Sequence, residues 1–223
     1  MAKGIDIVNV LLKHEGDDYV FGALTPVGAK NPHVFDCSKF ASWGVYQASK
    51  IIYGTDNNYG NPMHVYGGTI YWNRDVKSMG KAISVSEAAA IPGAAILRLA
   101  TGSRCGHIVI SQGNGRTIEA ASSSLGVVQL GVNNRRWSTG ILVPGIEYDL
   151  SNVATSLAPP ATIYHIGSRG DAVKKIQAAL GIDDDGIFGP ITEDAVEAFQ
   201  REVHLVPDGE VGPLTLNALE LTL

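Results

Sequence analysis

The stretch NPHVFDCSKFASWGVYQA, residues 31–48, contains one of the two cysteines of the chain. After Cys37, small and apolar residues recur at the spacing of one helix face as far as Ala48. This pattern predicts a helix that begins at Cys37 and packs closely against a second layer, which we expect to be a β-sheet. The partial positive charge at a helix N-terminus favours thiolate over thiol, so the position suits a nucleophile.

A cysteine nucleophile needs a base, and His107 is the candidate. Alternating residues around His107 predict a strand, GNG at 113–115 predicts a turn, and RTIEAAS at 116–122 predicts the returning strand. With a three-residue loop, His107 and Glu119 are diagonal neighbours on one face, whereas a two-residue loop puts them on opposite faces. The first arrangement would give Cys37 as nucleophile, His107 as base and Glu119 as the group that orients the imidazole.

The composition is that of an ordinary soluble globular protein, with 45% hydrophobic and 17% charged residues and a net charge of −5. There is no apolar run long enough to span a bilayer. No basic patch is present, so nucleic acid is a poor candidate partner. The two cysteines and the scattered histidines match no metal-ligand spacing, and we expect no metal or other cofactor. The remaining histidines are interpreted as surface or structural residues: His14, His33, His64, His165 and His204.

A change of composition divides the chain. Residues 151–161 are small, polar and rich in proline, which is typical of a linker. We therefore predict a domain at 1–150 and a second at 162–223. The second carries 4 basic and 11 acidic side chains, and it contains an internal repeat: DGIFGPIT at 185–192 returns 23 residues later as DGEVGPLT at 208–215. Each copy predicts an Asp-Gly turn followed by a helix start with proline in its first turn.

The segment 162–223 resembles the PG_binding_1 type of peptidoglycan-binding domain. The resemblance rests on GDAVKKIQAALGI, DDGIFGPITEDAVEAFQ and LVPDGEVGPLTLNAL. It implies a small all-α domain of three helices that binds bacterial peptidoglycan.

Residues 5–145 resemble the NlpC/P60 family of cell-wall cysteine peptidases, through VFDCSKFASWGVY and GHIVISQGNGRTIEAAS. The resemblance implies an α+β papain-like domain in which a helix with the cysteine packs on an antiparallel sheet with the histidine. It implies Cys37 as nucleophile, His107 as base and Glu119 in a third polar position, where many relatives have histidine.

Three further residues carry over from the same family as substrate-binding residues. Tyr19 matches a family tyrosine that would donate a hydrogen bond to the reacting carbonyl. Asp36 and Ser38 flank Cys37 and resemble residues that contact the stem peptide of peptidoglycan. Cys105 lies two residues before His107, and we interpret it as a buried free thiol; a disulfide to Cys37 is the second hypothesis.

These resemblances together imply a peptidoglycan hydrolase that cleaves an amide of the stem peptide through a cysteinyl acyl-enzyme. Cleavage next to D-glutamate is the first expectation, and N-acetylmuramoyl-L-alanine amidase activity is the second. Two further hypotheses are a non-catalytic wall-binding or tail structural protein and an acyltransferase on the same fold.

We expect a monomer. The first residues lack the features of a secretory signal, so we expect synthesis in the cytoplasm and delivery to the wall as a phage endolysin or injected effector.

Overall fold

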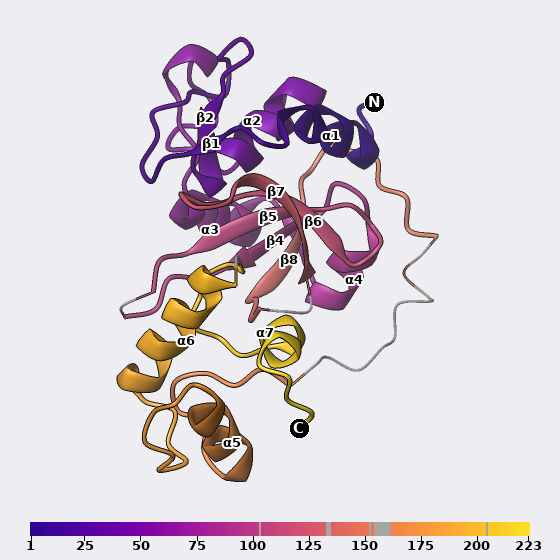
Figure 1. Ribbon diagram of the computed structural model, residues 1–223. Helices are drawn as coiled ribbons and strands as arrows, with labels where there is room; N and C mark the ends of the chain where they lie inside the picture. The colour runs from indigo at the N-terminus through magenta and orange to yellow at the C-terminus, as the bar shows by residue number, and fades with distance from the viewer. Residues whose placement is uncertain (103, 133–134, 152, 154–161, 204) are drawn as a thin grey trace. The chain divides into compact units, whose positions relative to one another are not determined.

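The computed structural model describes residues 1–223 except 103, 133–134, 152, 154–161 and 204. The chain forms two compact units (Figure 1): residues 1–132 with 137–158, called the N-terminal unit, and residues 133–136 with 159–223, called the C-terminal unit. Most of the predicted linker at 151–161 lies outside the described residues, and the domain borders drawn from the sequence stay predictions.

The N-terminal unit is an α+β domain, as the sequence predicts. Its helices are α1 (Gly4–Leu11), η1 (Leu12–His14), α2 (Cys37–Ser49), η2 (Pro62–His64), α3 (Thr69–Ser78) and α4 (Val85–Ala90). Its strands are β1 (Asp18–Tyr19), β2 (Val34–Phe35), β3 (Lys81–Ile83), β4 (Ala95–Arg98), β5 (His107–Ser111), β6 (Arg116–Ser122), β7 (Gly126–Gly131) and β8 (Thr139–Leu142).

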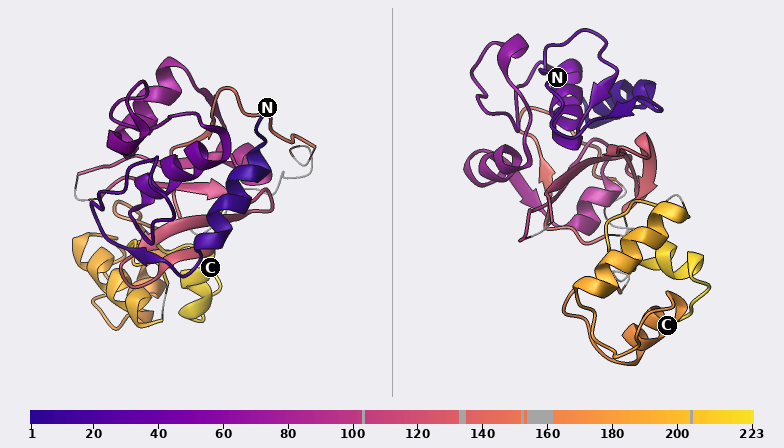
Figure 2. Two further views of the ribbon diagram at one scale, coloured as in Figure 1. Left: turned by 90° about the horizontal axis from the view of Figure 1, so that it is seen from above. Right: turned by 60° about the vertical axis from the view of Figure 1, so that its left-hand side comes forward.

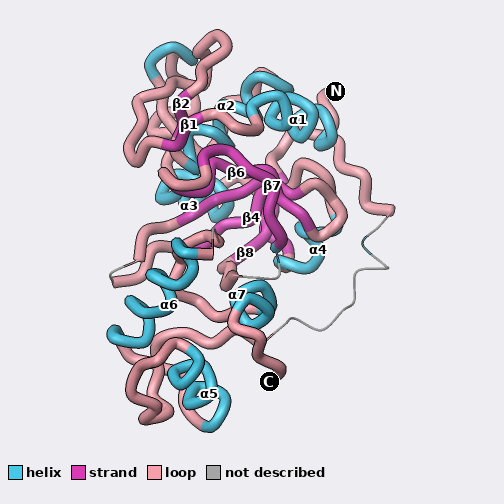
Figure 3. Tube along the Cα trace, in the orientation of Figure 1, coloured by secondary structure: helices cyan, strands magenta, loops and turns pink. Residues whose placement is uncertain are grey.

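Six of these strands form one antiparallel sheet in the order β3-β8-β4-β5-β6-β7. The other two, β1 and β2, form a separate parallel pair. Figure 3 shows strands β4, β6, β7 and β8 of this sheet side by side in magenta.

The centre of the sheet is covered on both faces because alternate residues of β4 and β5 enter different cores. Leu97, Ile108 and Ile110 pack with residues of α1 and α2. Ile96 and Val109 pack instead with residues of α4. Figure 1 shows α1 and α2 on one side of the sheet and α4 on the other.

Helix α2 is fixed against α1 by a close approach at Gly44. A Cβ atom at Gly44 would lie 2.4 Å from Cδ2 of Leu11, so only glycine fits there without a shift. Figure 2 shows this helix pair from above. The tight contact holds α2, and with it Cys37 at its first position, in one place over the sheet.

The C-terminal unit contains the three predicted helices, α5 (Asp171–Ala179), α6 (Pro190–Glu202) and α7 (Pro213–Ala218). The helices enclose a small core of Val173, Ile176, Phe188, Val196 and Val211. As the repeat predicts, α6 and α7 each have proline in their first turn.

The repeat is also visible in the hydrogen bonds. The buried Gln177 amide donates to Asp185 Oδ1, to the Ile187 carbonyl and to Thr192 Oγ1, and its oxygen accepts from Gly186 N at 2.8 Å. Gln200 makes the same four contacts 23 residues later, with its oxygen 2.9 Å from Gly209 N; its other partners are Asp208, Glu210 and Thr215. Each glutamine thus braces one Asp-Gly turn against the next helix.

Replacing either brace should destabilise the C-terminal unit to a similar degree. Gln177→Ala and Gln200→Ala each remove four hydrogen bonds and leave a buried turn-glycine N–H, of Gly186 or Gly209, without its partner, and we expect a loss of about 2–3 kcal/mol in unfolding free energy. Chemical denaturation measures the loss, and hydrogen exchange at Gly186 and Gly209 localises it. Lys175→Ala, an exposed change on α5, is the matched control. Wild-type protection at Gly186 in Gln177→Ala would contradict the bracing role.

Candidate active site

Cys37 is the first residue of α2, and the Asp36 side chain caps the helix. Asp36 Oδ1 accepts hydrogen bonds from the backbone N–H of Ser38 at 3.0 Å and of Lys39 at 2.9 Å. Oδ2 accepts from Lys39 Nζ at 2.8 Å. These bonds fix the first turn of the helix and therefore the direction of the Cys37 side chain, which is 8% exposed.

The β5–β6 hairpin has the predicted register. Ile110 pairs with Ile118 and Ser111 with Thr117, so the three-residue loop is the correct interpretation. As a consequence, His107 and Glu119 meet on one face, and His107 Nε2 lies 2.7 Å from Glu119 Oε2. Both side chains are buried.

Cys37 lies near the end of the β5–β6 hairpin at which β5 no longer pairs with β6. β5 pairs with β4 as far back as His107 opposite Arg98, whereas its pairs with β6 begin only at Ile110. Ile108, in the half of β5 that does not pair with β6, lies close enough for its backbone to lower the pKa of the Cys37 thiol. Ile108 directly follows His107 in β5. The candidate nucleophile in α2 therefore lies near the end of the strand that carries the candidate base.

The environment of Cys37 favours the neutral thiol. Burial raises the pKa of Cys37 to about 12, and the Asp36 carboxylate adds to the rise. The Ile108 backbone and the Arg98 guanidinium act in the opposite direction but more weakly, and Glu119 raises the pKa slightly. Desolvation and the nearby carboxylate thus act against the helix dipole, which the sequence was expected to use in favour of the thiolate. At neutral pH the thiol keeps its proton and needs a base.

Tyr19 ends β1 beside the same site. Burial raises its pKa above the usual range, and negative charge on Cys37, Asp36 and Cys105 would raise it further. Its hydroxyl consequently stays protonated and can donate a hydrogen bond. The pairing of Tyr19 with Phe35 sets its position, since Phe35 precedes Asp36 and Cys37 along the chain.

Asp36 and Ser38 are both buried, and they contact each other: Ser38 Oγ donates to Asp36 Oδ1 at 2.8 Å. Together with the capping bonds, this contact makes them part of the support beneath Cys37. Their contact with a substrate stays a prediction.

Three residues that the sequence did not single out complete the surroundings. Thr117 Oγ1 donates to Glu119 Oε1 at 2.5 Å and fixes the carboxylate. The Trp137 ring stacks on the His107 ring, with centroids 6.1 Å apart and planes 26° apart. Arg98 faces His107 across β4 and β5 and brings positive charge to Cys37. Thr117 lies two residues before Glu119 in a strand, so it shares the same face and could have been found from the register; Arg98 and Trp137 carry no such signal.

Cys37 and Cys105 are both free thiols in the structure. Cys105 is exposed, which corrects the interpretation of a buried thiol. It lies in the loop between β4 and β5, where its side chain is exposed to solvent.

Two of the histidines interpreted as surface or structural residues, His14 and His33, contact the same carboxylate. His14 Nδ1 lies 2.6 Å from Asp17 Oδ2, and His33 Nδ1 lies 2.9 Å from Asp17 Oδ1. The sequence did not reveal this cluster because the pairing of β1 with β2 brings together residues 16 positions apart.

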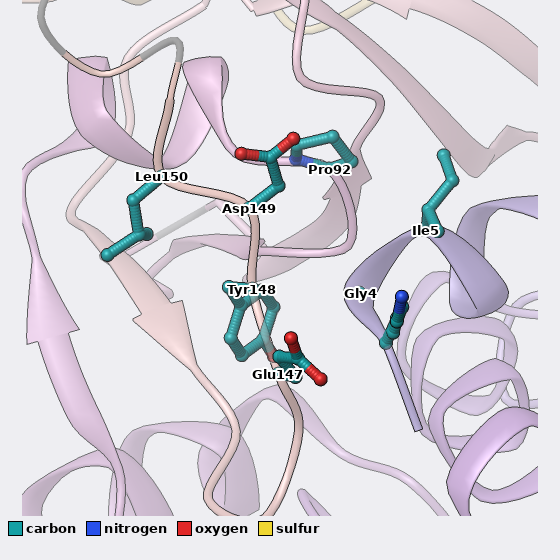
Figure 4. Close-up of a pocket in the computed structure, with 8 residues that line it drawn as sticks. Gly4, Ile5, Pro92, Glu147, Tyr148, Asp149 and Leu150 are labelled. Carbon is teal, nitrogen blue, oxygen red and sulfur yellow. The ribbon is translucent and has the colours of Figure 1, made fainter. Parts of the chain in front are cut away.

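A separate cavity of about 710 Å³ lies between the start of α1 and residues 147–150 (Figure 4). Its lining includes Gly4, Pro92, Glu147, Tyr148 and Asp149. None of the candidate catalytic residues lines it.

Among the described residues, no helix has the length and hydropathy needed to cross a membrane.

Comparison with known families identifies the C-terminal region. Residues 169–219 match the PG_binding_1 family model, described as "Putative peptidoglycan binding domain". The predicted resemblance of this region is therefore confirmed. None of the curated proteins matches the chain.

Several solved structures are similar to parts of the chain. A fused zinc-dependent amidase/peptidase with a peptidoglycan-binding domain, from Clostridium acetobutylicum, is 38% identical with a TM-score of 0.27, over 28% of this chain and 31% of that one. The NlpC/p60 domain of the peptidoglycan hydrolase SagA is 23% identical with a TM-score of 0.44, over 63% of this chain and 99% of that one. NlpC2 from Trichomonas vaginalis is 18% identical with a TM-score of 0.46, over 66% of this chain and 48% of that one. The last two carry the name of the family that the motifs around Cys37 and His107 resemble.

The raised pKa of Cys37 predicts its reaction with iodoacetamide. We expect alkylation to keep accelerating from pH 7 to pH 10, because the thiolate fraction grows about tenfold per unit below the pKa. Asp36→Asn keeps the helix cap but removes a negative charge, so it should lower the pKa and speed alkylation at pH 8 by about 3- to 10-fold.

Peptide mass spectrometry follows Cys37 separately, with the exposed Cys105 as internal reference. Asp194→Asn, an exposed change of equal charge on α6, is the control. A plateau of Cys37 alkylation near pH 8, or an unchanged rate in Asp36→Asn, would argue against this electrostatic account.

Proposed function

We propose that the protein is a peptidoglycan hydrolase that cleaves an amide bond of the stem peptide by cysteine catalysis. The observation that carries the proposal is the buried His107–Glu119 pair, together with the effect of Ile108, the next residue of the same strand, on the pKa of the Cys37 thiol. The PG_binding_1 domain at residues 169–219 supports peptidoglycan as the substrate.

The reaction begins with a neutral thiol. As Cys37 attacks the carbonyl carbon, His107 accepts the thiol proton and becomes imidazolium. Glu119, held by Thr117, stabilises this cation and keeps the ring in place. His107 then passes the proton to the leaving amine, and the acyl group remains on the sulfur. Water, activated by the neutral imidazole, hydrolyses the thioester and frees Cys37.

The substrate carbonyl gains negative charge in each tetrahedral intermediate. Tyr19 is the candidate donor for this oxygen, because its hydroxyl stays protonated and it lies close to Cys37. The Arg98 guanidinium contributes positive charge at the same place. Both effects act on charge that develops during the reaction, which is the condition for lowering the barrier.

The C-terminal unit would hold the enzyme on its polymeric substrate and raise the local concentration of stem peptides. We propose cleavage next to D-glutamate as the specific reaction, following the resemblance of residues 5–145 to NlpC/P60 peptidases. Use of the protein as a phage endolysin stays a prediction.

Digestion of purified peptidoglycan with wild-type protein and with Cys37→Ala tests the proposal. Mass spectrometry should find fragments ending at D-glutamate with wild type and none with Cys37→Ala. Intact stem peptides with a free L-alanine amine would identify an amidase instead. Absence of product from wild type, with sedimentation on peptidoglycan retained, would overturn the catalytic proposal and leave a wall-binding protein.

The His107–Glu119 bond predicts the effect of Glu119→Gln. The amide is nearly the same shape but cannot stabilise the imidazolium, and its NH₂ group can favour the wrong ring tautomer. We expect kcat/KM for amide cleavage to fall by about 10²- to 10⁴-fold. Thr117→Val should cause a smaller loss, because it only loosens the carboxylate.

Glu15→Gln, an exposed change of equal charge, is the control for both variants. Amine release gives the rate, and circular dichroism verifies folding. Near-wild-type kcat/KM in a folded Glu119→Gln would rule out an orienting role for this carboxylate.

A further inference from the structure

A cluster of three metal-ligating side chains lies outside the candidate active site. His14 ends η1, Asp17 directly precedes β1, and His33 directly precedes β2. The Asp17 carboxylate lies between the two imidazoles, 2.6 Å from His14 Nδ1 and 2.9 Å from His33 Nδ1. One ligand atom from each residue can be chosen so that all three lie within 4.8 Å of one another.

The backbone holds this cluster in place independently of the side chains. Asp17 N donates to the His14 carbonyl at 3.0 Å, and Asp18 N donates to the His33 carbonyl at 3.1 Å. The Asp17 carbonyl in turn accepts from Val127 N, at the start of β7, at 2.8 Å. All three ligand residues are therefore anchored to the sheet framework, and little conformational entropy would be lost when a ligand binds.

The donor set selects a class of cation. Two imidazole nitrogens and a carboxylate suit zinc and the neighbouring transition metals, whereas calcium and magnesium require more oxygen ligands. Zinc binds histidine nitrogen and carboxylate oxygen at about 2.0–2.2 Å, so ligand atoms around it lie about 3.4 Å apart. The ligand atoms of the cluster lie within 4.8 Å of one another, so they would have to move closer by at most about 1.4 Å, which side-chain rotation can supply.

The cluster is buried on the side of His14 and open to solvent on the side of His33. His14 is 6% exposed, and its ring packs edge-on against Trp43 and Phe35 at centroid distances of 4.6 and 5.6 Å. His33 has a side chain that is 66% exposed, which leaves solvent access for the ion and for a water ligand. The Asn31 amide nitrogen Nδ2 lies 3.2 Å from His33 Nε2. With its oxygen turned toward the ring, this amide would accept the Nε2 proton and leave Nδ1 free for the metal.

The geometry points to a binding site for a zinc-class divalent cation, with His14 Nδ1, His33 Nδ1 and an Asp17 oxygen as ligands and water completing the coordination. The ion would bind the lone pair of each Nδ1, with the proton of each ring on Nε2. The ion would clamp β1 to β2, the two strands that lead to Tyr19 and to Cys37.

Zinc titration of the full chain after treatment with EDTA tests this site. Calorimetry should give one ion per chain with a Kd in the micromolar range or below. Thermal unfolding of the N-terminal unit should shift upward by about 5–10 °C at a hundredfold excess over Kd.

His33→Ala is the main variant, because its exposed side chain can be removed without opening the core, and Asp17→Asn is the second. Each should weaken zinc binding by at least tenfold and abolish the thermal shift. His64→Ala, an exposed histidine elsewhere in the same unit, is the matched control. Cys37→Ala and Cys105→Ser should bind like wild type, since no thiol belongs to the cluster.

Failure of wild type to bind zinc would overturn the inference. Equal binding by wild type, His33→Ala and Asp17→Asn, or loss of binding in the cysteine variants, would place the ion elsewhere and overturn it as well. All these readouts are independent of peptidoglycan cleavage, so they stand or fall separately from the proposed hydrolase activity.

Discussion

The register of one hairpin is the constraint on which the candidate site depends. Side chains of a strand alternate between faces, so His107 and Glu119 can meet only if the loop between β5 and β6 keeps Ile110 opposite Ile118. A slip of one residue would turn the carboxylate to the other face and would also move Ile118 out of the core shared with α2. The same apolar burial that stabilises the sheet therefore enforces the contact between the two polar residues.

The position of Cys37 combines two opposing physical demands. The first turn of α2 must pack against β5 to be held in place, and this packing removes the thiol from water. The cap residue Asp36 orders the same turn but brings a negative charge next to the sulfur. The result is a well-positioned thiol with a raised pKa, which in the proposed reaction would require the carboxylate-backed imidazole of His107 as its base. Precise placement of the thiol is thus obtained at the expense of its acidity.

Much of this arrangement could be predicted from the sequence because it is local. The helix start at Cys37 follows from apolar spacing, and the contact of His107 with Glu119 follows from loop length and strand alternation. The helices of the C-terminal unit follow from the repeated turn and proline. The cluster of His14 with His33 could not be predicted, because it depends on a two-residue parallel pairing that leaves no periodic pattern. The raised pKa of Cys37 was missed for a related reason: burial depth is a property of the packed layers rather than of the motif.

The glutamine braces of the C-terminal unit have a consequence for how its two halves can vary. Gln177 and Gln200 build two turns from equivalent bonds, yet the residue after the turn glycine differs, Ile187 in one copy and Glu210 in the other. The glutamine bonds to those two residues use only their carbonyl oxygens, so the brace does not dictate which side chain stands there. The duplicated turn thus separates the architecture of the brace from the side-chain chemistry at this position, where an exposed isoleucine stands in one copy and a buried glutamate in the other.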